Sequence, residues 1–362
     1  MEKKWSKVKF VVGLFIFQII LYQLLFSSEQ IINFIVNSIT FPISGFVGRI
    51  TNSINLPLGE IFYLIVLIYS IYLIIRLIIN LITNKKRVPS SVFHFLLLLN
   101  IVCFVYTFAW SVMYKKESIT FDKETIKIDP IILKEIYCAE LDKAIYFRNK
   151  LNVSDRKRIK YSSSLNDYNE EFVNLQYKLK DISWLKNYRF LEYPQYKLST
   201  ISIIQNYIGI LGYYNPFTVE SNLNKYNTKL KQSSTMFHEY GHQMGFASES
   251  EANFLAYYLG TQSKNPETNY SVYYKSIFSL LSALAKTDPL FVKIELDNLD
   301  SRIKFDRQAE IDYYTKYEGK TSETFSELNN QFLKANNQEG TISYSKYVEF
   351  IYYLHTIKKR NY

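Results

Sequence analysis

The chain has 362 residues, which is long enough for a membrane anchor and one sizeable soluble domain. Its formal net charge of +10 is uneven, because residues 1–114 hold nine Lys or Arg against three acids in a mostly apolar sequence. Basic residues beside apolar spans set membrane orientation, whereas a nucleic-acid binder needs them clustered on a folded face. We therefore exclude a nucleic-acid partner. A disulfide framework is also excluded, since Cys103 lies in an apolar run and Cys138 is the only other cysteine.

Three apolar stretches within residues 1–114 are long enough to cross a bilayer, which takes about 20 helical residues. The loop between the first two, residues 27–60, is partly apolar and contains Pro42 and Pro57. We expect this loop to lie on the outer surface of the membrane, with a fourth crossing as the alternative. The three predicted spans are residues 10–26, 61–82 and 92–113.

The lysines and arginines of the short loops predict the orientation of these spans. Four lysines precede the first span and three basic residues, 85–87, lie between the second and third, whereas the first loop holds only Arg49. We therefore expect a cytoplasmic amino terminus, with the bilayer as a partner. An odd number of spans then puts residues 115–362 outside the cytoplasm as a separate domain.

The soluble part is dominated by amphipathic helical patterns, of which Ile131 to Tyr146 and Tyr270 to Leu284 are the clearest. Short β-like runs occur near Leu198 to Ile210 and Phe217 to Leu223. The fold class that these patterns indicate is α+β with an excess of helix.

One motif carries chemistry: His238-Glu239-Tyr-Gly-His242, on a predicted helix. Residues four apart share a helical face, so both imidazoles can reach one Zn²⁺ ion while Glu239 projects beside the metal. Zinc lowers the pKa of a bound water and polarises a carbonyl, and a nearby carboxylate can move the proton. The motif therefore predicts peptide hydrolysis with Glu239 as general base.

The third zinc ligand must be an acid that follows the motif. Gly245 suits a helix stop, and Ser248 then opens a second helix that contains Glu249 and Glu251. Ser248 and Glu251 have the spacing of a capping box, which would occupy Glu251 structurally. Glu249 is therefore the favoured ligand and Glu251 the alternative, and Asn253 could supply an amide that orients a histidine ligand.

At these residues the sequence resembles the gluzincin group of zincin metallopeptidases, in which a second helix supplies a glutamate after His-Glu-x-x-His. The segment Glu249-Ser-Glu-Ala-Asn253 is similar to the Glu-x-x-Ala-Asn/Asp segment of several such families, including the CAAX prenyl endopeptidases. The resemblance implies a zincin-like domain with Glu249 as ligand. Only six residues separate His242 from Glu249, fewer than in most gluzincins, so the connection must be a tight turn.

Over nearly its whole length the chain resembles a family of bacterial multi-pass membrane proteins that is described as a domain of unknown function. That likeness implies a presumed zinc-peptidase fold and brings no substrate. It rests on the amino-terminal spans and on segments 212–220, 238–247, 251–254, 332–334 and 340–347.

Four further residues are candidates for the site. In zincins the strand before the metal helix binds extended substrate along its edge, which makes Phe217 and Glu220 candidates for substrate binding. An oxyanion donor is also needed, and Tyr344 and Tyr347 lie in the carboxyl-terminal segment that the family resemblance covers. Packing is the ordinary role of a tyrosine in a chain with 32 of them.

These observations predict a membrane-anchored endopeptidase that uses one Zn²⁺ ion and acts on a peptide or protein outside the cytoplasm. The alternative is an inactive zincin-like membrane protein that binds a partner without cutting it. An intact Glu239 favours the enzyme, because a binding scaffold needs no carboxylate there. A structural zinc site is disfavoured, because such sites have four protein ligands and often include cysteine.

Overall fold

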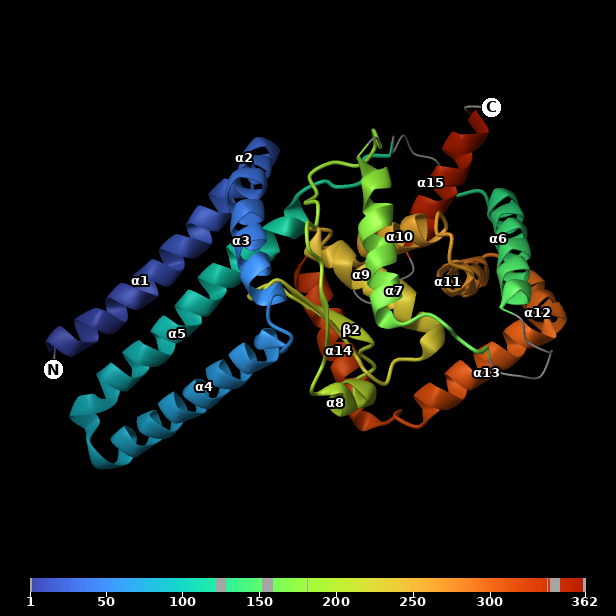
Figure 1. Ribbon diagram of the computed structural model, residues 1–362. Coiled ribbons are helices and arrows are strands. Elements are labelled where there is room, and N and C mark those ends of the chain that lie inside the picture. The colour runs from blue at the N-terminus through green and yellow to red at the C-terminus, as the bar shows by residue number, and fades with distance from the viewer. Residues whose placement is uncertain are drawn as a thin grey trace. The chain divides into compact units, whose positions relative to one another are not determined.

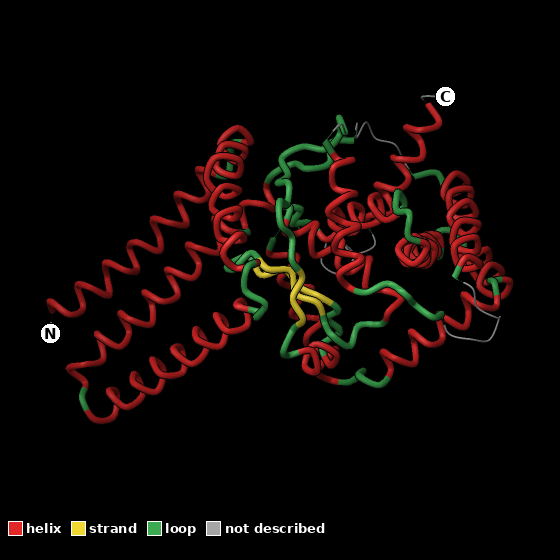
Figure 2. The backbone as a smooth tube through the Cα atoms, in the orientation of Figure 1, coloured by secondary structure: helices red, strands yellow, loops and turns green. Residues whose placement is uncertain are grey.

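The computed structural model describes residues 2–121, 128–151, 159–180, 182–336, 338 and 346–360. The described chain is mostly helical, and Figure 2 shows how little of it is strand. It forms two compact units: Met1–Lys116 with Asn215–Glu220, and Glu117–Tyr214 with Ser221–Tyr362. The expected excess of helix over strand is confirmed.

The first unit is built from long apolar helices. Helices α1 and α4 each pack along α5, and in Figure 1 the three run side by side. Their exposed faces consist of Ile, Leu, Phe and Tyr side chains, which is compatible with contact with lipid. The helices of this unit are α1 (Glu2–Leu25), α2 (Glu29–Ile35), α3 (Phe41–Asn52), α4 (Leu58–Thr83) and α5 (Val88–Ala109).

The segment between α1 and α4 differs from the expected loop. A π-helical stretch, Val36–Thr40, joins α2 to α3, so residues 29–52 form one helical segment that is long and apolar enough to cross a membrane. The described chain thus holds four such segments, against three predicted. In Figure 1, however, α2 and α3 run at a marked angle to the direction shared by α1, α4 and α5. The Thr40 hydroxyl donates to the Phe108 carbonyl (3.0 Å), near the end of α5.

Residues Asn215–Glu220 belong to the first unit because their side chains bind the start of α4. Glu220 is fully buried and accepts hydrogen bonds from the amides of Leu58 (3.2 Å) and Gly59 (2.6 Å). The first amides of a helix have no partner within it, so this carboxylate caps α4. The Phe217 ring lies 5.0 Å from that of Phe62 and 6.1 Å from that of Tyr63.

The second unit is a helical domain with a three-stranded sheet. The predicted helices near 131–146 and 270–284 are confirmed as α6 and α11, which pack closely on each other. Its core is rich in buried aromatic side chains such as Phe237, Phe254 and Tyr270. The helices are α6 (Pro130–Lys150), α7 (Leu165–Leu175), α8 (Ser202–Tyr207), α9 (Lys229–Gln243), α10 (Glu249–Gly260), α11 (Pro266–Leu284), α12 (Pro289–Asn298), α13 (Ser301–Thr315), α14 (Lys320–Ala335) and α15 (Tyr347–Arg360).

The sheet has the order β1-β3-β2, and β1 pairs in parallel with β3. The predicted strand near 198–210 is wrong beyond its first residue, because α8 follows β1. The Ser199 hydroxyl accepts the amide of Ile201 (3.2 Å), a local turn that ends the strand despite the β-branched residues that follow. The second predicted strand forms only from Glu220 onward. The strands are β1 (Tyr196–Leu198), β2 (Gly212–Asn215) and β3 (Glu220–Leu223).

Candidate metal centre

Helix α9 carries the His-Glu-x-x-His motif on its last two turns. His238 and His242 lie one turn apart with ring centroids 4.6 Å from each other, as the helical period requires. The opposite side of the same turns is core: Phe237 and Tyr240 are fully buried and pack against Phe172 of α7. Burial of these aromatic rings fixes the rotation of α9 and so the direction of both imidazoles.

A Schellman turn ends α9 immediately after the motif. Gly245 has φ 102°, its amide donates to the His242 carbonyl (2.9 Å), and the Phe246 amide donates to the Gly241 carbonyl (3.0 Å). The glycine predicted as the helix stop is confirmed. The turn also places the Phe246 carbonyl 2.7 Å from Nδ1 of His242, which donates to it and leaves Nε2 available as a ligand.

Helix α10 begins directly after this turn and presents Glu249 to the two histidines. Ser248 is the N-cap residue, as predicted, but its side chain makes no capping hydrogen bond and instead lies 2.7 Å from the Ser250 hydroxyl. The predicted capping box with Glu251 is therefore wrong. Glu251 is nonetheless not among the residues whose ligand atoms converge with the two imidazoles in the described chain.

Small residues let α9 and α10 approach closely enough to bring Glu249 into reach. A Cβ atom on Gly241 would lie 3.3 Å from both Cα of Ala252 and Cδ2 of Leu255. Gly241 is one of the two variable positions of the motif, and Ala252 faces it from α10. The close contact between the two helices thus depends on residues inside the segments that carry the ligands.

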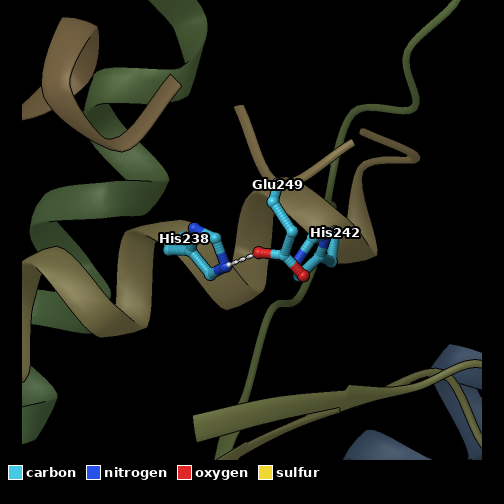
Figure 3. Close-up of side chains that lie close together, drawn as sticks. All are labelled: His238, His242 and Glu249. Atoms are coloured by element: carbon cyan, nitrogen blue, oxygen red, sulfur yellow. Dashed lines mark ion pairs between the residues drawn. The ribbon is translucent and has the colours of Figure 1, made fainter. Parts of the chain in front are cut away.

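The ligand atoms of His238, His242 and Glu249 all lie within 4.8 Å of one another, and Figure 3 shows the three side chains pointing to a common point. Oε2 of Glu249 is 3.2 Å from Nε2 of His238 and 3.7 Å from Nε2 of His242. Within the described chain this oxygen is buried and accepts no hydrogen bond of proper geometry. A buried carboxylate oxygen without a donor fits a cation at this point. Two imidazole nitrogens and one carboxylate oxygen are a donor set that suits Zn²⁺.

The charges within the cluster are strongly coupled. Burial favours the neutral acid at Glu249, but the two histidines outweigh it and hold the pKa of Glu249 well below its usual range. Burial also opposes protonation of His242, yet the carboxylate of Glu249 raises the pKa of His242 to about 9. Burial and the charge of His242 lower the pKa of His238 to about 4.

Glu239 lies beside the cluster without joining it. It is 4% exposed, and burial raises its pKa to about 8, although His242 and Lys275 act in the opposite direction. Strand β2 approaches it closely, because a Cβ atom on Gly212 would lie 2.9 Å from Oε1 of Glu239. Only a glycine leaves room there for the carboxylate. A carboxyl group with a pKa near neutral can both accept and donate a proton at physiological pH.

Lys275 is a residue of the site that the sequence did not indicate. It projects from α11 toward Glu239 and Glu249. Its ammonium donates to Oδ1 of Asn253 (2.6 Å), and burial, with the charge of Lys231, lowers its pKa to about 8. Asn253, predicted to orient a histidine ligand, thus accepts a hydrogen bond from the Lys275 ammonium. Nothing local in the sequence marks this lysine as buried, since it stands in an amphipathic helix like many exposed lysines.

The remaining candidates fall in different places. Tyr347 is 1% exposed on α15 and its ring lies 5.8 Å from Nζ of Lys275, whereas Tyr344 lies outside the described residues. Phe217 and Glu220 stay predictions as substrate-binding residues, and the structure shows other contacts for both. Strand β3 is the middle strand of the sheet and offers no edge to a substrate. Both side chains also bind α4: Glu220 caps it, and Phe217 packs on its aromatic rings.

Comparison with known proteins adds a family but no activity. The family described as "Protein of unknown function (DUF3810)" matches residues 36–352, which is most of the chain and covers parts of both units. No curated protein and no solved structure matches the sequence. On the extent of that match, the chain belongs to the DUF3810 family of proteins of unknown function.

Proposed function

We propose that this protein is a membrane-anchored zinc endopeptidase of the gluzincin type. The observation that carries the proposal is the convergence of His238, His242 and Glu249 within 4.8 Å, beside a buried Glu239. Three protein ligands leave a coordination position for water, which is the arrangement of catalytic rather than structural zinc sites. The apolar helices of the first unit support the membrane anchor.

The chain's own residues would divide the work of hydrolysis. Zinc bound at this site would act as a Lewis acid toward water and toward the scissile carbonyl. In its ionised form, Glu239 would take a proton from the attacking water and return it to the leaving nitrogen. The bond from His242 to the Phe246 carbonyl fixes that ring while these steps occur.

We further propose that the metal centre lies outside the cytoplasm. The lysines before α1 and the basic cluster 85–87 support a cytoplasmic amino terminus. The marked angle of α2 and α3 to the other helices of the first unit supports three crossings rather than four, because a helix at such an angle suits the membrane interface. An exposed apolar stripe on this segment, Ile43, Phe46 and Ile50, would face the lipid.

The test uses the full chain purified in detergent, with zinc measured by mass spectrometry and hydrolysis of fluorescently labelled casein. We expect about one zinc per chain in the native protein and in Glu239→Gln, and hydrolysis by the native protein alone, reduced at least about 100-fold by the substitution. Glu249→Ala should lose zinc, whereas the matched variant Glu251→Ala should keep it. Zinc retained with no difference in hydrolysis between native protein and Glu239→Gln would contradict an enzyme and favour a binding protein.

A further inference from the structure

A cavity of about 440 Å³ lies in the first unit, between the second half of α4 and the start of α5. It is separate from the metal centre, and every residue that lines it belongs to positions 72–90. Polar groups from both helices and their connection line it together with apolar side chains of α4. Those groups include Arg76, Asn80, Arg87 and Ser90, with Ile75 and Ile79 as the apolar part.

Among the described residues, no acid pairs with the two arginines of this cavity. Residues 61–116 contain neither Asp nor Glu, and no carboxylate of the described chain forms an ion pair with Arg76 or Arg87. Arg76 stands seven residues before the end of α4, which is about 10 Å along the helix axis. A charged side chain inside an apolar span is costly unless a partner of opposite charge reaches it. Since no described carboxylate of the chain reaches them, a ligand from outside the chain is the candidate for the compensating anion.

The walls of the cavity indicate what kind of anion fits. Ile75 and Ile79 are about half exposed, as is expected of a surface that touches acyl chains. A free phosphate ion would gain nothing from these isoleucines, whereas a phospholipid would place its phosphate at the arginines and its chains along α4. The cavity is also held in shape, since Nδ2 of the buried Asn80 donates to the Ser91 hydroxyl (2.8 Å) and ties α4 to α5.

We propose that this cavity is a binding site for an anionic phospholipid, with Arg76 and Arg87 holding the phosphate. Arginine suits this role because its planar guanidinium makes paired hydrogen bonds to phosphate oxygens. Basic pockets between membrane helices are known to take anionic headgroups. The lipid site shares no residue with the metal centre, so its test is independent of the test of the peptidase proposal.

The experiment reconstitutes the full chain into nanodiscs of an equimolar mixture of phosphatidylcholine and phosphatidylglycerol. After extraction into detergent, native mass spectrometry counts the lipids that remain bound. We expect retained phosphatidylglycerol in the native protein, about fivefold less in Arg87→Gln, and a further loss when Arg76→Gln is added. Lys85→Gln is the matched control, because it removes the same charge from the same connection without lining the cavity, and it should retain the lipid.

Several outcomes would overturn the proposal. Equal retention of phosphatidylcholine would show that the phosphate charge is not what the cavity recognises. Equal loss in Lys85→Gln and Arg87→Gln would show a general surface attraction rather than a site. Displacement of the lipid by millimolar glycerol phosphate would assign the cavity to a soluble phosphate. Arg87 is exposed at the helix end, so its substitution tests the site even where a change at Arg76 prevents insertion.

Discussion

His238 and His242 differ in protonation although they lie one helical turn apart. Glu249 raises the pKa of His242 to about 9, whereas burial and the neighbouring charge lower that of His238 to about 4. At neutral pH the cluster without metal therefore holds one imidazolium–carboxylate pair and one neutral imidazole. A zinc ion must displace the proton of His242 before that ring can bind it.

This difference predicts how zinc affinity depends on pH. Below pH 9 His242 is protonated, so the apparent affinity should fall about tenfold for each unit by which the pH decreases, or about 100-fold between pH 8 and pH 6. Titration calorimetry in buffers of different protonation enthalpy measures the proton released on binding. In a Glu239→Gln and Lys275→Met double variant, which removes the two neighbouring groups with a pKa of about 8, one proton should remain. An affinity independent of pH over this range would contradict the pairing of His242 with Glu249.

Lys275 influences the same site from a neighbouring helix. Its positive charge lowers the pKa of Glu239, so Lys275→Met should raise that pKa and move the acidic limb of the kcat/KM profile to higher pH. The substitution also removes the donor to Asn253, and we expect zinc content to be retained. Lys286→Met, which changes an exposed lysine close in sequence, should leave the profile in place. If the pH dependence of kcat/KM is the same in Lys275→Met as in the native protein, Lys275 has only a packing role.

At the scale of elements, β3 connects two parts of the chain through consecutive residues. Glu220 caps α4, while the next side chain, Ser221, donates to the Glu239 carbonyl (3.2 Å) and to Oε1 of Gln243 (3.1 Å). Successive side chains of a strand point to opposite faces, which is why neighbours can hold two different helices. Consecutive residues of β3 thus contact α9 and the start of α4.

This connection predicts the effect of Glu220→Ala. The amides of Leu58 and Gly59 lose their acceptor, which should cost about 1–3 kcal/mol of unfolding free energy and remove their protection from hydrogen exchange. Exchange in α9 should rise as well, because Ser221 is attached to the released residue. Glu220→Gln keeps one carbonyl acceptor and should lie between native and alanine. Faster exchange confined to the start of α4 would show that the two helices are not coupled.

The sequence predicts the convergence of His238, His242 and Glu249 better than it predicts the surroundings of these residues, for physical reasons. The ligands are close in sequence, and a helical period and one glycine turn suffice to position them. The contact of Lys275 with Asn253 joins residues 22 positions apart, and the contact of Glu220 with α4 joins residues about 160 positions apart. No local sequence pattern predicts contacts over such separations. The strand predicted over 198–210 failed because the Ser199 turn outweighs the β propensity of the isoleucines.

At the scale of the whole molecule, the number of membrane crossings would decide on which side of the bilayer the candidate metal centre lies. Residues 29–52 are apolar and long enough to cross, yet in Figure 1 they run at a marked angle to the other helices of the first unit. Three crossings put the second unit on the opposite side from the amino terminus, and four put both on the same side. Basic residues before α1 and at 85–87 favour the first arrangement.

The thiol of Cys138 can distinguish three crossings from four, because it is exposed on α6 in the second unit. In intact spheroplasts of a Cys103→Ser variant, a membrane-impermeant maleimide should label Cys138 if the domain is extracytoplasmic. Partial burial and the nearby Glu295 raise the pKa of this thiol, so the reaction should be slower at pH 7 than at pH 8.5, where more thiolate is present. The double variant lacking both cysteines sets the background. Labelling that requires detergent would favour four crossings and a cytoplasmic peptidase, since the metal cluster lies in the same unit as Cys138.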